Sequence, residues 1–162
     1  MPPDIRVKNA KQVDGDFHAR ICVKKKTYMY VYSKDKIISP FEYDTVSPLE
    51  YDVNVDLIKS VAKNLIGTHN FKAFCSTGTS AINFERTIFD ICLEEKENKL
   101  VFYVTGNGFL YNMVRIIVGT LIDVGRGKLP DNTIQKMLET GDRSLGGKTA
   151  KPNGLYLYKV EY

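Results

Sequence analysis

The chain has 162 residues, of which 43% are hydrophobic and 26% are charged, and its net charge is +4. This length suffices for a domain with a core of its own, and no apolar run is long enough to span a bilayer. The three cysteines, Cys22, Cys75 and Cys92, are widely spaced, which favours a reducing cytoplasm over a disulfide framework. The two histidines are also far apart in sequence, so no metal site is predicted. Residues 1–4 lack the basic start and apolar run of a signal peptide.

The first third of the chain is predicted to be mainly extended. Residues 5–13 alternate weakly and are interpreted as a strand. Residues 20–32 predict a better strand, in which three alternate tyrosines share one face. Residues 33–36 are turn-like, and residues 37–52, which contain two prolines, are expected to form an extended loop.

Helices and strands alternate in the rest of the chain. Asn54 is expected to cap a helix with one apolar stripe, and Gly67 is expected to end it. Residues 86–95 and 99–105 predict a hairpin.

A strong helix with an apolar side is predicted after residues 106–108 and is expected to end near Gly125. Asp131 is expected to cap a shorter helix that ends at Gly141, and a last strand covers residues 155–162. The elements together predict one α+β domain over residues 1–162, with an antiparallel or mixed sheet and helices packed on one face.

Two glycine-containing segments look like phosphate-binding motifs but lack residues that the chemistry needs. After residues 106–108, the third glycine of a dinucleotide fingerprint would fall at Tyr111, whose bulk prevents close packing of helix on strand. Residues 147–149 resemble the end of a P-loop, but Asp142 occupies the leading glycine position and would repel a phosphate. Neither nucleotide-binding motif is therefore predicted.

Three segments carry patterns that folding alone explains poorly. They are Asp16-Phe17-His18-Ala19-Arg20 with Lys26-Thr27-Tyr28-Met29-Tyr30, then Gly106-Asn107-Gly108-Phe109-Leu110-Tyr111-Asn112-Met113-Val114-Arg115 continuing to Gly119, and Thr149-Ala150-Lys151 with Gly154-Leu155-Tyr156-Leu157. In this order and at these distances, they resemble the signature segments of the tRNA pseudouridine synthase A family. The resemblance runs from about Pro2 to the end of the chain.

The resemblance implies an enzyme that isomerises uridine to pseudouridine in the anticodon stem-loop of tRNA. It implies a cytoplasmic homodimer with no cofactor, no metal and no membrane association. Tyr28 matches the tyrosine that stacks on the target base and takes part in proton handling, and Arg115 matches the arginine that pairs with the catalytic aspartate. Leu155 matches an apolar residue of the base pocket. Four more residues are assigned to substrate binding: Arg20, Lys26, Phe109 and Asn112.

One block of the family pattern has no counterpart in the sequence. The family nucleophile is an aspartate in a Gly-Arg-Thr-Asp-Ala-Gly-Val-His block, and Asp14, Asp16 and Asp142 all lie in other contexts. The chain is therefore interpreted as the C-terminal part of such an enzyme, without the N-terminal half that carries the nucleophile, and it is predicted to be inactive alone. An exposed strand edge and self-association are also expected. Cys75 replaces an arginine of some members, which puts one tRNA contact in doubt.

Other interpretations of these residues remain open. An aromatic wall contributes about 1–3 kcal/mol of stacking to a flipped base, but Tyr28 is also one of three tyrosines on a strand face. Arg115 lies off the apolar stripe of its helix, so it either meets an anion from elsewhere or is solvated. Leu155 is otherwise an ordinary core residue, and residues 24–26 fit an RNA groove or a solvated edge equally well.

Two other functions compete with the enzyme interpretation. The first is a non-catalytic RNA-binding module that uses residues 24–32 as a stacking platform, although the pattern of the common RNA-binding sheet modules is missing. The second is a structural or oligomerisation domain. A steep salt dependence of tRNA binding would favour either RNA interpretation over the structural one.

Overall fold

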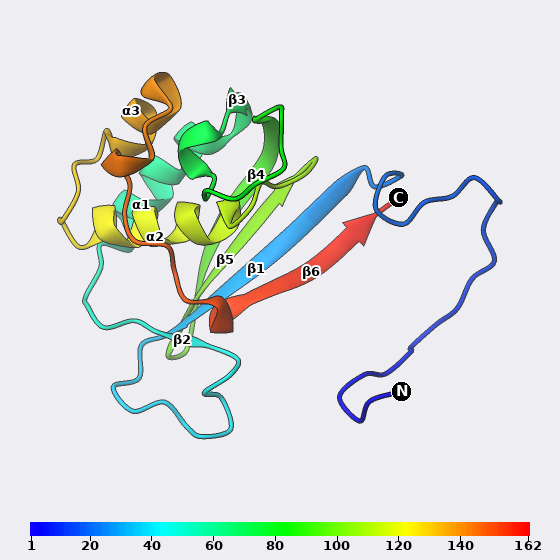
Figure 1. Ribbon diagram of the computed structural model, residues 1–162. Coiled ribbons are helices and arrows are strands. Elements are labelled where there is room, and N and C mark those ends of the chain that lie inside the picture. The colour runs from blue at the N-terminus through cyan, green and yellow to red at the C-terminus, as the bar shows by residue number, and fades with distance from the viewer.

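Six strands form one mixed sheet in the computed structural model, which describes residues 1–162 (Figure 1). The strands are β1 (Lys25–Ser33), β2 (Ser47–Pro48), β3 (Gly67–Asn70), β4 (Glu85–Lys96), β5 (Lys99–Gly106) and β6 (Leu155–Glu161). Their order is β2-β1-β5-β4-β3, and β6 pairs with β1. Only the β1–β2 pair is parallel, and β6 has no second neighbour, so its outer edge is open.

Three α-helices pack on one side of this sheet (Figure 1). They are α1 (Val55–Ala62), α2 (Met113–Gly125) and α3 (Thr133–Thr140). Four 3-10 turns also occur: η1 (Lys63–Leu65), η2 (Lys72–Phe74), η3 (Arg143–Leu145) and η4 (Pro152–Gly154). The expected α+β fold, a mixed sheet with helices packed against it, is confirmed. No helix is both long and apolar enough to cross a membrane.

The main core lies between the helices and the sheet and contains 27 buried residues. Alternate residues of β1 and β5, including Tyr30 and Phe102, point into it, as period-two strands require. The other face of the sheet has a cluster of only three buried residues, Val31, Val46 and Val101. The sheet is therefore thickly covered on one face and thinly on the other.

Helix α2 is the central element of the core. Every residue of this helix is buried except Arg115, so the helix is covered on all sides. Its apolar stripe had predicted burial on one side only. The chain around Lys148 covers its second side, because a Cβ atom on Gly119 would lie 1.9 Å from the Lys148 carbonyl oxygen. The Gly147 amide also donates to the buried Thr120 hydroxyl, at 3.1 Å.

Several local signals in the sequence are confirmed. The Asn54 side chain accepts the Leu57 amide at 2.9 Å and caps α1. Strands β4 and β5 form the predicted hairpin. Gly141 adopts the left-handed conformation (φ 70°) at the end of α3. The loop over residues 37–52 contains only the two-residue strand β2.

Three expectations about elements are wrong. Residues 5–13 form no strand and are exposed, because no other part of the chain pairs with them. Strand β1 begins at Lys25 and not at residue 20, because a turn precedes it in which the Cys22 amide bonds to the His18 carbonyl. Asn132, and not Asp131, precedes α3, and the Thr133 amide bonds to the Pro130 carbonyl, so no side-chain cap is used.

Candidate functional site

Two aromatic rings mark one end of the packed face of the sheet. Tyr28 lies on the same face of β1 as the fully buried Tyr30, but it is only half-buried. Its ring meets Phe109 edge-on, with centroids 5.1 Å apart and an interplanar angle of 85°. Gly106 allows this approach, because a Cβ atom there would lie 2.8 Å from the Thr87 carbonyl oxygen and 3.2 Å from the Phe109 ring. Phe109 thus holds the Tyr28 ring from one side.

Leu155 and Lys26 lie on either side of Tyr28. Leu155, the first residue of β6, is in register with Tyr30, and both Leu155 and Tyr28 pack against the main core. Lys26 precedes Tyr28 by two residues, so it shares the same face of β1, and it lies opposite Gly106. An aromatic ring, an aliphatic side chain and a cation therefore lie together along the β1–β6 pair.

Arg115 brings a cation without an ion-pair partner to the site. Its Nε donates to the Ala150 carbonyl at 2.7 Å, and its Nη1 donates to the Asn112 Oδ1 at 2.8 Å. The Ala150 amide in turn donates to the Arg115 carbonyl at 3.1 Å. No carboxylate of the chain forms an ion pair with Arg115, and Nη2 has no protein partner. The guanidinium is thus anchored on one side and free to meet an anion on the other.

Asn112 precedes α2 in a left-handed conformation, with φ 59° and ψ 10°. Its Oδ1 accepts from Arg115, and its Nδ2 donates to the Ser76 hydroxyl at 3.1 Å. The Ser76 amide also bonds to the Tyr111 carbonyl at 3.1 Å. Asn112 therefore joins the chain after η2 to the start of α2.

Tyr30 is a supporting residue, which the sequence analysis placed on a strand face and in a signature segment without giving it a role. Its hydroxyl donates to the Lys151 carbonyl at 2.6 Å and lies 2.7 Å from the Ser47 hydroxyl. Burial raises the pKa of Tyr30, although the bond to Ser47 and the charge of Arg115 act in the opposite direction, so the hydroxyl stays a neutral donor. Tyr30 and Arg115 together hold residues 150–151, which lead into Leu155. Alternation shows which face Tyr30 takes but not this long-range bond.

Of the residues assigned to the site, Tyr28, Lys26, Phe109, Asn112, Arg115 and Leu155 gather around the β1–β6 pair and the start of α2. Arg20 does not join them. It is exposed on a turn that docks at the far end of β6, where the Tyr162 hydroxyl donates to the Ala19 carbonyl at 3.1 Å.

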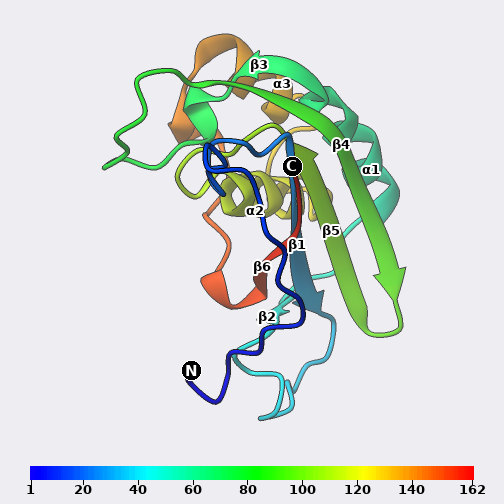
Figure 2. The same ribbon diagram turned by 90° about the vertical axis from the view of Figure 1, so that its right-hand side faces the viewer.

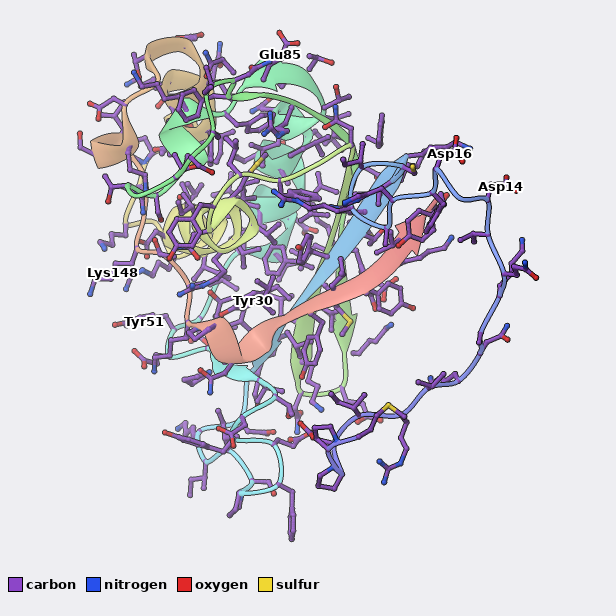
Figure 3. All side chains as sticks on the ribbon, turned by 45° about the vertical axis from the view of Figure 1, so that its right-hand side comes forward. Asp14, Asp16, Tyr30, Tyr51, Glu85 and Lys148 are labelled. Carbon is purple, nitrogen blue, oxygen red and sulfur yellow. The ribbon has the colours of Figure 1, made fainter.

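The acidic residues of the N-terminal segment lie away from this cluster. Asp14 and Asp16 belong to the irregular chain before β1 and lie near the end of β6, while Tyr30 lies near its start (Figure 3). In Figure 2 the same segment runs in front of β6 and β1, at the edge of the sheet that faces the viewer. Nowhere in the chain do three or more histidine, cysteine, aspartate or glutamate side chains gather as metal ligands would.

Comparison with known proteins shows the family of the chain. A family model described as tRNA pseudouridine synthase matches residues 61–162. Proteins named tRNA pseudouridine synthase A are 43% identical in Bacillus subtilis (strain 168), 42% in Thermoanaerobacter sp. (strain X514) and 45% in Anoxybacillus flavithermus. These alignments cover all of this chain, but only 66%, 66% and 65% of the respective relatives. The chain belongs to the tRNA pseudouridine synthase family.

Proposed function

We propose that this chain is the part of a tRNA pseudouridine synthase A that holds the target uridine and the charge partner of the nucleophile. The observation that carries the proposal is Arg115, the only residue of α2 that is not buried. It is anchored by Ala150 and Asn112 and has no carboxylate partner. It lies in the first turn of the helix that follows Phe109, the residue that contacts Tyr28. An anion supplied from outside this chain would complete the site.

The three central side chains have distinct roles in this proposal. Tyr28, held edge-on by Phe109, is a flat wall for a flipped uracil, and its hydroxyl takes part in moving a proton. Leu155 lines the same pocket. The Arg115 guanidinium pairs with the nucleophilic aspartate and, because an adjacent cation lowers the pKa of a carboxyl group, keeps it ionised for attack.

The proposed reaction is an isomerisation that needs no cofactor and no metal. The bond between the ribose and N1 of uracil breaks, the base turns within the pocket, and a bond to C5 of the base replaces it. The proton leaves C5, and N1 regains one, so the product has the same composition as the substrate. The aspartate that attacks is not among the residues assembled here, and we propose that the chain alone is inactive.

The partners follow from the same proposal. The substrate is the anticodon stem-loop of tRNA, and Lys26, two residues before Tyr28 on the same face of β1, supplies a positive charge beside the aromatic pair. The open outer edge of β6 is where the sheet would continue into the part that carries the nucleophile. We propose a cytoplasmic enzyme, in agreement with three cysteines that form no disulfide, and a homodimer as its working state.

The test uses this chain fused to the part of the Bacillus subtilis relative that has no counterpart in it. Tritium release from 5-tritiated uridine in a tRNA transcript reports the exchange at C5. Tyr28→Ala should lower kcat/KM by roughly 5- to 150-fold, the loss of about 1–3 kcal/mol of stacking. Tyr43→Ala, which removes an exposed tyrosine from the loop before β2, is the control. Equal activity of the two variants would contradict the role of Tyr28.

A further inference from the structure

The backbone of Asn112 is unusual for this chain. Only Glu97 and Asn112 adopt a positive φ without being glycine. Glu97 lies between β4 and β5, where a hairpin turn accounts for it. Asn112 lies at the start of a buried helix, beside the proposed site. Asparagine tolerates this conformation better than most residues.

The side chain of Asn112 does not do what an asparagine before a helix ordinarily does. At that position the side-chain oxygen usually accepts a backbone amide of the first turn. Here no such cap bond exists. Both polar atoms of the amide are instead used by side chains, because Oδ1 accepts from Arg115 and Nδ2 donates to Ser76.

These two bonds determine how Arg115 is oriented. The guanidinium is planar, so a single bond from Nε to the Ala150 carbonyl leaves it free to tilt about that contact. The second bond, from Nη1 to Asn112, defines the plane and thereby the direction of Nη2. Ser76 contributes indirectly: because its hydroxyl accepts the Asn112 Nδ2, the amide presents its oxygen to Arg115.

We propose that Asn112 is a positioning residue, which orients the Arg115 guanidinium so that Nη2 faces the incoming anion, and that Ser76 fixes the Asn112 amide. The effect on catalysis rests on the proposed function, whereas the effect on the orientation of Arg115 does not. Asn112 therefore acts through Arg115, whereas the sequence analysis assigned it to substrate binding. Its left-handed backbone aims the side chain away from the helix amides and toward these two partners.

Four variants separate the backbone from the side chain. Asn112→Gly keeps the left-handed conformation and removes both hydrogen bonds. Asn112→Asp keeps an acceptor for Arg115 but adds a negative charge that competes with the incoming anion. Ser76→Ala removes only the bond that fixes the amide. Glu97→Gly is the matched control, because it makes the same kind of change at the other positive-φ residue, far along the hairpin.

The first readout is the order of Arg115 in the chain itself, measured by NMR as the exchange of the Nε proton and the rotation of the guanidinium. We expect both to be faster in Asn112→Gly than in Glu97→Gly, with Ser76→Ala between them. Unchanged dynamics of Arg115 in Asn112→Gly would overturn the proposal, whether or not the protein is an enzyme.

The second readout is the kinetics of the fusion with the Bacillus subtilis part. Asn112→Gly should lower kcat by about 10- to 100-fold, the cost of a misplaced charged group, and leave KM for tRNA nearly unchanged. Asn112→Asp should lose as much, Ser76→Ala less, and Glu97→Gly should match the unsubstituted fusion. If Arg115 became mobile in Asn112→Gly while kcat stayed the same, the positioning role would be overturned. If the unsubstituted fusion made no pseudouridine, the proposed function would fail, and the NMR readout alone would decide the role of Asn112.

Discussion

The two faces of the sheet differ in depth, although the same strands make both. On the helix side, 27 buried residues form a continuous core. On the opposite side, the buried hydrophobic cluster contains only Val31, Val46 and Val101, which pack against partly exposed neighbours. Adjacent residues of one strand, such as Phe102 and Val101, thus contribute to very different environments.

We call the helix-covered side of the sheet the deep face and the opposite side the thin face. The residues of the proposed site all belong to the deep face or to its margin. Tyr28 continues the row of Tyr30 and Tyr32 to the point where the core ends, and Arg115 projects from the most buried helix. No residue of the thin face joins the cluster. A site built at the margin of a dense core has rigid support on one side and access on the other, which a reaction that depends on fixed geometry requires.

The largest effect on the free energy of unfolding should come from truncating a core side chain of the deep face, measured against its neighbour on the thin face. Phe102→Ala, at a residue that is 1% exposed, should lower the free energy of unfolding by about 3–5 kcal/mol. Val101→Ala, at a residue that is 5% exposed in the three-residue cluster, should lower it by only about 1–2 kcal/mol. Urea denaturation measures both values. Equal losses would show that the two faces do not differ in stability as their burial indicates.

A second, smaller effect is expected where the chain crosses α2. In Gly119→Ala the new methyl group meets the Lys148 carbonyl, so residues 147–151 must move and the bond from Arg115 to Ala150 weakens. Overpacking of this kind costs about 1–3 kcal/mol. Thermal unfolding of Gly119→Ala should therefore begin at a lower temperature than that of Gly15→Ala, which has open space around it. Identical melting curves would mean that this crossing is loose.

The burial of Tyr32 on the deep face should make the free energy of unfolding depend on pH in the alkaline range. Burial raises the pKa of Tyr32 well above its ordinary value of 10.0, as the neutral hydroxyl is favoured in the folded state. Its contribution is fully present below pH 10.0 and is lost as the pH rises beyond that value, because only the unfolded state then releases the proton.

Urea denaturation of the parent chain and Tyr32→Phe over a pH series measures this contribution. Above the ordinary pKa of tyrosine, the free energy of unfolding should fall more steeply in the parent, because only the parent has Tyr32. The lysine ion pairs weaken in the same pH range, but both proteins contain them, so they do not affect the difference. Parallel curves would show that Tyr32 ionises as easily in the folded chain as in the unfolded one.

The smallest effect on the free energy of unfolding is expected at the N-termini of α1 and α3. Asn54→Ala removes the bond to the Leu57 amide and should lower the free energy of unfolding by about 1 kcal/mol. Asp131→Ala, which removes a side chain that caps nothing, should change it by less than about 0.5 kcal/mol. The reverse order would mean that Asp131 caps α3 in solution.

Local patterns predicted the fold where neighbours in sequence determine the structure. Asn54, Gly141 and the β4–β5 hairpin were identified because caps and turns act over a few residues. Residues 5–13 were misassigned because alternation alone does not supply a partner strand. The full burial of α2 was missed because its second side is covered by a segment that lies about 30 residues further along the chain.

The site shows the same limit. The sequence analysis assigned Tyr28, Phe109, Asn112, Arg115 and Leu155 to the site. In the structure Tyr28 contacts Phe109, Arg115 bonds to Asn112, and Leu155 is in register with Tyr30. The resemblance assigned no role to the residues that hold them in place, although Ala150 and Tyr30 lie in its signature segments. The Ala150 carbonyl, Ser76 and the Tyr30 hydroxyl contact the site over long sequence separations. No periodicity in the sequence encodes such bonds.

The central claim is that this chain supplies the base wall and the charge partner of a pseudouridine synthase but not its nucleophile. Pseudouridine formation in an unmodified tRNA transcript tests it most directly, with the chain alone and with its fusion to the remaining part of the Bacillus subtilis relative. The account predicts no product from the chain alone and product from the fusion. Product from the chain alone would contradict it, because one of its own side chains would then have to act as the nucleophile.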